Sequence, residues 1–95
     1  MVNVQELINS DDVVVFSKSY CPFCVRAKTE LAKYTKFTAY ELETRDDGSE
    51  IQTKISQISG IRTVPQIFIK GTPIGGCDDL LNLSRSGKLK NMLPK

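Results

Sequence analysis

The sequence contains no histidine and no tryptophan, and only three of its 95 residues are cysteines. The absence of histidine excludes a catalytic Cys–His pair and any zinc site with imidazole ligands. Three cysteines are too few for a scaffold of disulfides, and their odd number suits a reducing compartment. No apolar run approaches the roughly 18 residues that a membrane helix needs, and residues 1–16 lack the pattern of a signal peptide. We therefore expect a soluble protein of the cytoplasm.

The charge and the length of the chain indicate which partners to expect and how many domains the chain can form. Thirteen Lys and Arg residues are nearly balanced by eleven Asp and Glu residues, for a net charge of +2. Because nucleic-acid binding depends on concentrated positive charge, we expect no nucleic-acid partner, and nothing in the sequence indicates a membrane partner. With 40% hydrophobic residues, a chain of this length can build one small core. The sequence therefore predicts a single domain over residues 1–95.

The first half of the chain is predicted to form alternating helices and strands. Apolar residues at helical spacing predict a short helix over 4–8, with Asn3 as its N-cap. The β-branched run VVVF at 13–16 predicts a central strand that is covered on both faces. A helix follows with Pro22 in its first turn, and a second strand is predicted over 38–43. Strand, helix and strand in this order predict a right-handed parallel βαβ unit.

The second half predicts two more strands between helices. Isoleucines at helical spacing indicate a helix that contains residues 51–58 and ends at Gly60. QIFIK at 66–70 predicts a third strand, and a tight turn leads to a short fourth strand around Pro73. The tail predicts a helix that ends at Gly87, followed by a last short helical turn. The fold class is therefore α/β.

The motif CPFC places Cys21 and Cys24 three positions apart at the carboxyl end of the first strand. A structural zinc site would need further ligands, and only Cys77 remains. A structural disulfide would close too short a loop to restrict the unfolded chain much. A redox role explains both spacing and position, because the helix N-terminus and Lys18 stabilise a thiolate at Cys21. Cys24 is then expected to resolve mixed disulfides formed on Cys21.

Several stretches together resemble the dithiol glutaredoxins of the thioredoxin-like superfamily. They are FSKSYCPFC at 16–24, EIQ at 50–52, GIRTVPQIFI at 60–69 and GGCDDL at 75–80. The resemblance covers nearly the whole chain and implies a thioredoxin-like fold, a four-stranded mixed sheet flanked by helices. It also implies that residues 1–95 form a single glutaredoxin domain.

The resemblance implies a glutathione site that begins beside the dithiol. By analogy with the family, Lys18 and Gln52 bind the glycyl carboxylate of glutathione, and Tyr20 lies beside the groove. Arg62 also matches the family, and the sequence leaves a ligand role and a structural role open for it. Phe23 takes a position where many members have tyrosine, and it either adds apolar surface to the groove or shields the dithiol.

The rest of the implied site comes from two later segments. Thr63 and Val64 form one wall, where the Val64 backbone pairs with the cysteinyl part of glutathione, and Pro65 is expected in the cis form. The N–H groups of Cys77 and Asp78 at a helix start receive the γ-glutamyl carboxylate, and the Asp78 side chain binds the ammonium group. Taken without the family, Cys77 is most simply a small buried hydrophobic residue.

The resemblance implies an enzyme, a glutathione-dependent thiol-disulfide oxidoreductase that reduces glutathione mixed disulfides and protein disulfides, such as that of ribonucleotide reductase. Its expected partners are glutathione or a glutathione-derived thiol, together with disulfide-bonded or glutathionylated proteins. We expect a monomer with no metal and no tightly bound cofactor, and with glutathione as co-substrate. Two alternatives remain: a carrier of iron–sulfur clusters, which Pro22 disfavours, and a general protein-disulfide reductase that does not depend on glutathione.

Overall fold

Four strands form one mixed sheet in the computed structural model, which describes residues 2–94. They are β1 (Val13–Ser17), β2 (Thr38–Glu41), β3 (Gln66–Ile69) and β4 (Thr72–Gly75), in the spatial order β2-β1-β3-β4. β2 runs parallel to β1, whereas β1 with β3 and β3 with β4 are antiparallel pairs. The predicted βαβ unit and the predicted four-stranded mixed sheet are confirmed.

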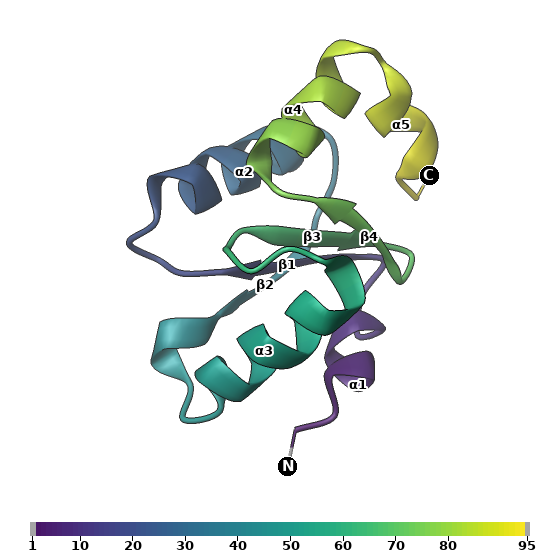
Figure 1. The fold of residues 1–95 in the computed structure, drawn as a ribbon. Coiled ribbons are helices and arrows are strands. Elements are labelled where there is room, and N and C mark those ends of the chain that lie inside the picture. The colour runs from purple at the N-terminus through teal and green to yellow at the C-terminus, as the bar shows by residue number, and fades with distance from the viewer. Residues whose placement is uncertain (1, 95) are drawn as a thin grey trace.

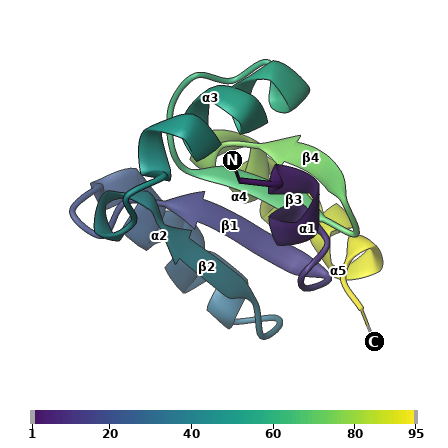
Figure 2. The same cartoon turned by 90° about the horizontal axis from the view of Figure 1, so that it is seen from below.

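Helices cover both faces of this sheet. α2 (Pro22–Ala32), α4 (Cys77–Arg85) and α5 (Lys88–Met92) lie on one face, and α1 (Val4–Ile8) and α3 (Gly48–Ser59) lie on the other (Figure 1). The view from below shows α1 and α3 in front of the strands (Figure 2). Across the described residues, none of the helices combines the length and the apolar character needed to span a membrane.

β1 is the centre of the core because both of its faces are covered. All five of its residues are buried. Successive side chains of a strand point to opposite faces, so Val13 and Val15 pack toward α2 and α4, while Val14 and Phe16 pack toward α1 and α3. The uninterrupted apolar run of the sequence is thus explained by two cores that share one strand.

The second strand is shorter than the sequence predicts. It ends at Glu41 rather than at residue 43, and Leu42–Thr44 forms a 3-10 helix. Leu42 is 2% exposed and joins the core under α3, so the chain turns inward here instead of continuing the strand. The Thr44 hydroxyl donates to the Glu41 carbonyl at 2.7 Å and closes the turn.

The other helix and strand limits agree with the sequence to within a few residues. Gly60 ends α3 with φ 79°, and Gly87 separates α4 from α5 with φ 80°. β3 ends at Ile69, one residue early, because Lys70 (φ 51°) and Gly71 (φ 80°) both take left-handed conformations in the turn to β4. These positions are the ones where glycine is favoured by its freedom at positive φ.

Substituting Gly48 tests the close contact between the 3-10 helix and α3. A Cβ at this residue would collide with the carbonyl oxygen of Leu42, which is backbone and has no side-chain freedom to move. We expect Gly48→Ala to lower the free energy of unfolding by about 3 kcal/mol, as overpacking does. Gly60→Ala is the matched control, because its Cβ would meet nothing within 4 Å and only the left-handed backbone costs about 1 kcal/mol. Urea unfolding measures both, and equal losses would contradict the contact.

Candidate active site

The dithiol lies where β1 passes into α2. Cys21 is the N-cap of α2, and its sulfur accepts a hydrogen bond from the Cys24 N–H at 3.4 Å. Pro22 occupies the first helical turn, where its missing N–H costs no intrahelical bond. Both cysteines are free thiols, Cys21 partly exposed and Cys24 buried. The prediction that Cys21 falls at a helix N-terminus is confirmed.

The surroundings of Cys21 favour its thiolate. Burial works in the opposite direction, but hydrogen bonds from the Cys24 side chain and from the backbone N–H groups of Cys24 and Phe23 outweigh it. The positive charge of Lys18 adds to them, and the pKa of the Cys21 thiol is lowered as a result. The start of α2 therefore stabilises a thiolate at Cys21, as the sequence predicts, because its unpaired N–H groups favour an anion.

Cys24 differs from Cys21 in both access and acidity. Its side chain is 0% exposed. Burial, together with the hydrogen bond and the charge of Cys21, raises the pKa of Cys24 to about 11. Near neutral pH only Cys21 combines thiolate character with access to a disulfide, so the geometry supports Cys21 as the nucleophile and Cys24 as the resolving thiol.

A short loop before β3 closes one side of the dithiol. The Val64–Pro65 peptide bond is cis, as the resemblance implies. The Cys21 thiol points at the carbonyl oxygen of Val64, with 3.9 Å between sulfur and oxygen. A cavity of about 310 Å³ opens on this side, and its lining includes Phe23, Thr63, Pro65, Cys77 and Asp78. The structure thus brings residues from three distant segments together beside Cys21.

The start of α4 forms part of this cavity. Gly76 is the N-cap, and its N–H donates to the Asp79 carboxylate at 3.0 Å. Gly75 has φ 126°, and a Cβ there would collide with the Asp79 side chain. Both Asp78 and Asp79 are exposed, and it is the Asp79 carboxylate that caps the helix. The first N–H groups of a helix have no intrahelical acceptor and suit a carboxylate.

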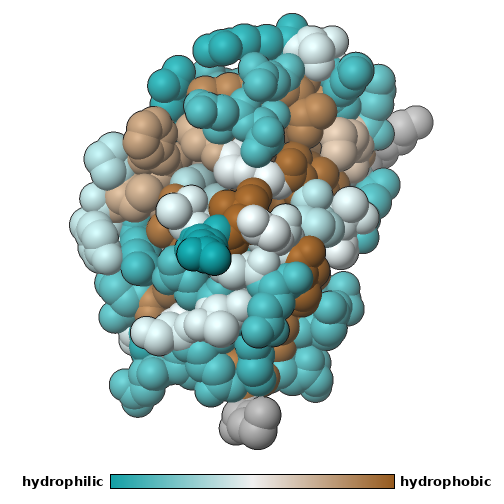
Figure 3. Space-filling model, viewed as in Figure 1, coloured by the Kyte–Doolittle hydropathy of each residue, from teal (hydrophilic) through white to brown (hydrophobic). Residues whose placement is uncertain are grey.

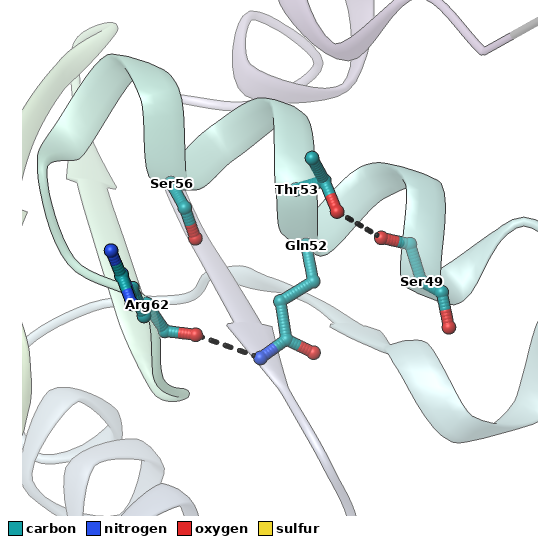
Figure 4. Close-up of a pocket in the computed structure, with 5 residues that line it drawn as sticks. All are labelled: Ser49, Gln52, Thr53, Ser56 and Arg62. Atoms are coloured by element: carbon teal, nitrogen blue, oxygen red, sulfur yellow. Dashed lines mark hydrogen bonds between the residues drawn. The ribbon is translucent and has the colours of Figure 1, made fainter.

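The remaining predicted residues gather on the other side of the dithiol. Lys18, Tyr20 and Gln52 all line a second cavity of about 210 Å³. Gln52 also borders a third, of about 420 Å³, with Arg62 and polar residues of α3 (Figure 4). There the Gln52 amide nitrogen donates to the backbone carbonyl of Arg62 at 2.9 Å. Gln52 thus fastens the loop that leads to the Val64 wall.

Sequence reasoning missed the role of Gln66. This residue is 1% exposed, and its amide nitrogen donates to the carbonyls of Ile61 (2.7 Å) and Thr63 (3.1 Å). The same nitrogen reaches the Ser56 hydroxyl at 3.3 Å, and the Ser59 hydroxyl donates to its oxygen at 2.7 Å. Gln66 therefore ties the loop beside Cys21 to the end of α3. The signal available in the sequence was a polar residue, Gln66, at the start of the apolar run QIFI.

Three large exposed side chains lie within a few residues of the dithiol in the sequence. Tyr20, Phe23 and Val25 are 69%, 59% and 49% exposed. In the space-filling view, apolar atoms lie on the side of the molecule where α2 begins and also across the middle of the same face (Figure 3). Phe23 lines the cavity next to Pro65, so it contributes to the groove. In residues 2–94, no three side chains of His, Cys, Asp or Glu come together in a group that could hold a metal ion.

Known proteins resemble this chain over nearly its whole length. The family model described as Glutaredoxin matches residues 13–74. Glutaredoxin-C2 of Arabidopsis thaliana is 51% identical over 94 residues, which are 98% of this chain and 85% of that protein. The crystal structure of a buckwheat glutaredoxin–glutathione complex has a TM-score of 0.91 and 44% identity, covering 95% of this chain and 83% of that one. A dithiolic glutaredoxin of Trypanosoma brucei brucei has a TM-score of 0.91 and 40% identity, covering 99% and 98%.

The contrast between the thiols predicts selective alkylation. Near pH 7, iodoacetamide should label Cys21 long before Cys24, because the pKa of Cys21 is lowered while that of Cys24 is raised to about 11. Peptide mapping by mass spectrometry locates the label. Lys18→Gln should slow labelling of Cys21, because it removes a charge that lowers the pKa, whereas Lys36→Gln, exposed and outside the dithiol, should not. Equal labelling of Cys21 and Cys24 in the folded protein would contradict the assignment.

Removing the amide of Gln66 tests whether it holds the loop. Gln66→Met keeps the approximate volume but leaves the carbonyls of Ile61 and Thr63 without their donor. We expect the free energy of unfolding to fall by roughly 3 kcal/mol, as for buried polar groups that lose their partners. Gln57→Met, on the exposed side of α3, is the matched control and should change stability by about 0.5 kcal/mol or less. Similar urea midpoints for the two variants would refute this role.

Proposed function

Because this chain belongs to the glutaredoxin family, a family of glutathione-dependent thiol oxidoreductases, we propose that it reduces glutathione mixed disulfides and protein disulfides through Cys21 and Cys24. One observation supports this most: a partly exposed cysteine with a lowered pKa caps a helix, directly beside a buried cysteine and a cavity. The proposed co-substrate is glutathione, which the buckwheat relative binds in its complex.

The first step is an attack by the Cys21 thiolate. It forms a bond to the glutathionyl sulfur of a mixed disulfide, and the bond between that sulfur and the partner protein breaks. The partner leaves as a thiolate and takes a proton from water, while glutathione remains attached to Cys21. The N–H groups at the start of α2 stabilise the attacking thiolate before the reaction.

Two cavities flanking Cys21 offer places for the ends of glutathione. In this proposal, the γ-glutamyl carboxylate binds the N–H groups of Cys77 and Asp78, and the Asp78 carboxylate binds the adjacent ammonium group. The use of Asp79 as the helix cap supports this assignment, because it leaves Asp78 available to a ligand. Thr63 and Val64 form the wall between this end and the sulfur, next to the cis-linked Pro65.

The glycyl carboxylate is proposed to bind in the second cavity. Lys18 supplies a positive charge there, and Gln52 supplies an amide N–H. The Gln52 amide nitrogen carries two hydrogens, and one of them bonds the Arg62 carbonyl, so the other is available to a carboxylate. Tyr20 lies at the edge of the same cavity. In this arrangement Arg62 supports the site through its backbone carbonyl, which accepts the hydrogen bond from Gln52.

The second step releases glutathione from Cys21. A second glutathione can attack the glutathionyl sulfur, which regenerates the Cys21 thiolate and yields oxidised glutathione. Alternatively Cys24 attacks the Cys21 sulfur, forms an intramolecular disulfide and displaces glutathione. The first route needs no second cysteine, whereas the second requires the buried Cys24 to lose its proton.

The proposed protein substrates carry glutathionylated cysteines or accessible disulfides, such as that of ribonucleotide reductase. The exposed Tyr20, Phe23 and Val25 around the opening support contact with a protein surface, because aromatic residues are enriched at interfaces. A monomeric state, a cytoplasmic location and a single domain over residues 1–95 belong to the same proposal.

A coupled assay tests the function. Reduction of a glutathionylated peptide is measured with glutathione as the electron donor and glutathione reductase consuming NADPH. We expect activity in the wild type, loss of activity in Cys21→Ser because the nucleophile is gone, and retention of most activity in Cys24→Ser because a second glutathione can complete the cycle.

Two controls complete the assay. Lys36→Gln, whose side chain is exposed and lies outside the dithiol and both cavities, should behave like the wild type. Replacing glutathione with thioredoxin reductase and NADPH should give no turnover. An inactive wild type with glutathione, or activity that survives Cys21→Ser, would overturn the proposal.

A further inference from the structure

A tight turn joins the end of β1 to the dithiol. The Cys21 N–H donates to the Lys18 carbonyl at 3.0 Å, which makes Lys18–Cys21 a four-residue turn with Ser19 and Tyr20 at its centre. Lys18 lines the second cavity, and Cys21 is the N-cap of α2. The conformation of this turn therefore sets the positions of a proposed binding residue and of the reacting thiol together.

Glu43 bonds the same turn from the outside. Its two carboxylate oxygens accept the Ser19 N–H at 3.2 and 3.1 Å, and one of them also accepts the Ser19 hydroxyl. The Lys18 carbonyl and the Ser19 N–H belong to a single planar peptide unit. That unit is bonded at both ends, by Cys21 inside the turn and by Glu43 outside it. It therefore cannot rotate without losing a hydrogen bond.

The sheet explains why Glu43 meets Ser19. β1 and β2 are parallel neighbours, and Ser17 and Glu41 are register partners at their carboxyl ends. Ser19 and Glu43 each lie two residues beyond these partners, where both chains have left the sheet. Glu43 belongs to the 3-10 helix whose Leu42 side chain is buried in the core under α3. The exposed carboxylate is therefore carried by an element with a fixed position.

The charge of Glu43 would oppose binding if it acted on the ligand directly. Glu43 lines the same cavity as Lys18 and Gln52, where the glycyl carboxylate of glutathione is proposed to bind. Two negative charges in one cavity repel each other. The pKa of Glu43 is lowered, chiefly by the hydrogen bond from the Ser19 hydroxyl, so Glu43 is ionised near neutral pH. Its contacts with Ser19 therefore indicate a role in holding the turn.

We propose that Glu43 is a positioning residue that holds the Lys18–Ser19 peptide so that the Lys18 ammonium meets the glycyl carboxylate of glutathione. Glu43 itself makes no contact with glutathione in this arrangement. The inference rests on the proposed function, because it assigns the glycyl carboxylate to the cavity of Lys18. Glu43 thereby contributes to a preference for small thiols that end in a carboxylate.

Steady-state reduction of two peptide substrates tests this role. One peptide carries disulfide-linked glutathione, and the other carries glutathione whose glycyl carboxylate is blocked as an ethyl ester. We expect Glu43→Ala to raise the KM for the first substrate about tenfold at unchanged kcat, the scale of losing one hydrogen bond to a charged group. The KM for the ester should equal that of the wild type, because the ester offers Lys18 no carboxylate.

Asp46→Ala separates position from charge. Asp46 is exposed and lines the same cavity, but the hydrogen bonds to Ser19 come from Glu43. Asp46→Ala should therefore not raise the KM for the glutathionylated peptide. An unchanged or lowered KM in Glu43→Ala, or an equal rise in the two variants, would overturn the inference. A rise of the same factor for both substrates would also overturn it, because it would show general damage to the dithiol.

Two further variants test whether Glu43 acts through the turn. Ser19→Ala removes the hydroxyl donor but keeps the charge of Glu43, so it should raise the same KM by a smaller factor. In a Lys18→Gln background, adding Glu43→Ala should cause no further rise, because the group that Glu43 positions is gone. A further tenfold rise there would overturn the inference. If Glu43→Ala does not fold, Ser19→Ala is compared with Asp46→Ala on the same two substrates.

The wild type separates this inference from the proposed function. A wild type that does not reduce the glutathionylated peptide would refute the proposed function. A wild type that reduces the glutathionylated and the esterified peptide with the same KM would leave the reduction of mixed disulfides in place. It would show that the glycyl carboxylate does not meet Lys18, and it would overturn this inference alone.

Discussion

The site depends on the abrupt passage from a fully buried strand into a helix. β1 is covered on both faces, and the chain leaves it at Ser17 and begins α2 at Pro22. Within these few residues Cys21 becomes the N-cap, where it meets unpaired N–H groups, and Cys24 is carried one turn further into the core. Two chemically identical side chains therefore acquire opposite properties, and their difference comes from position alone.

The second constraint is that the loop beside Cys21 lies at a fixed distance from it. The Val64 carbonyl is 3.9 Å from the Cys21 sulfur, and the loop is held in part by Val64, which packs against the core under α3, and by the buried Pro65. Polar contacts add to this packing, with Gln66 bonding two carbonyls from within the core and Gln52 bonding a third from the surface. A buried amide is well suited to the task because it can bond several backbone groups at once.

The sequence predicts much of this arrangement because the relevant signals are local. Apolar spacing, the run VVVF, Gly60 and Gly87 mark elements that the structure confirms, and CPFC after a strand indicates the helix terminus. The end of β2 was predicted wrongly, since the inward turn of Leu42 depends on the core under α3. Gln66 was missed for a related reason. Its partners lie in separate segments, and no local pattern states which residues will surround a polar side chain in the core.

Burial of Cys24 serves two requirements that oppose each other. A buried thiol is shielded from foreign disulfides, whereas the sulfur of Cys21 lies next to it at the start of the same helix. The same burial raises the pKa of Cys24 to about 11, so the thiol keeps its proton near neutral pH. A fully apolar environment would therefore protect the thiol and also prevent it from reacting. The backbone of Lys18 and the side chain of Ser17 both act to lower the pKa of Cys24, and so oppose the effect of burial without opening the core to solvent.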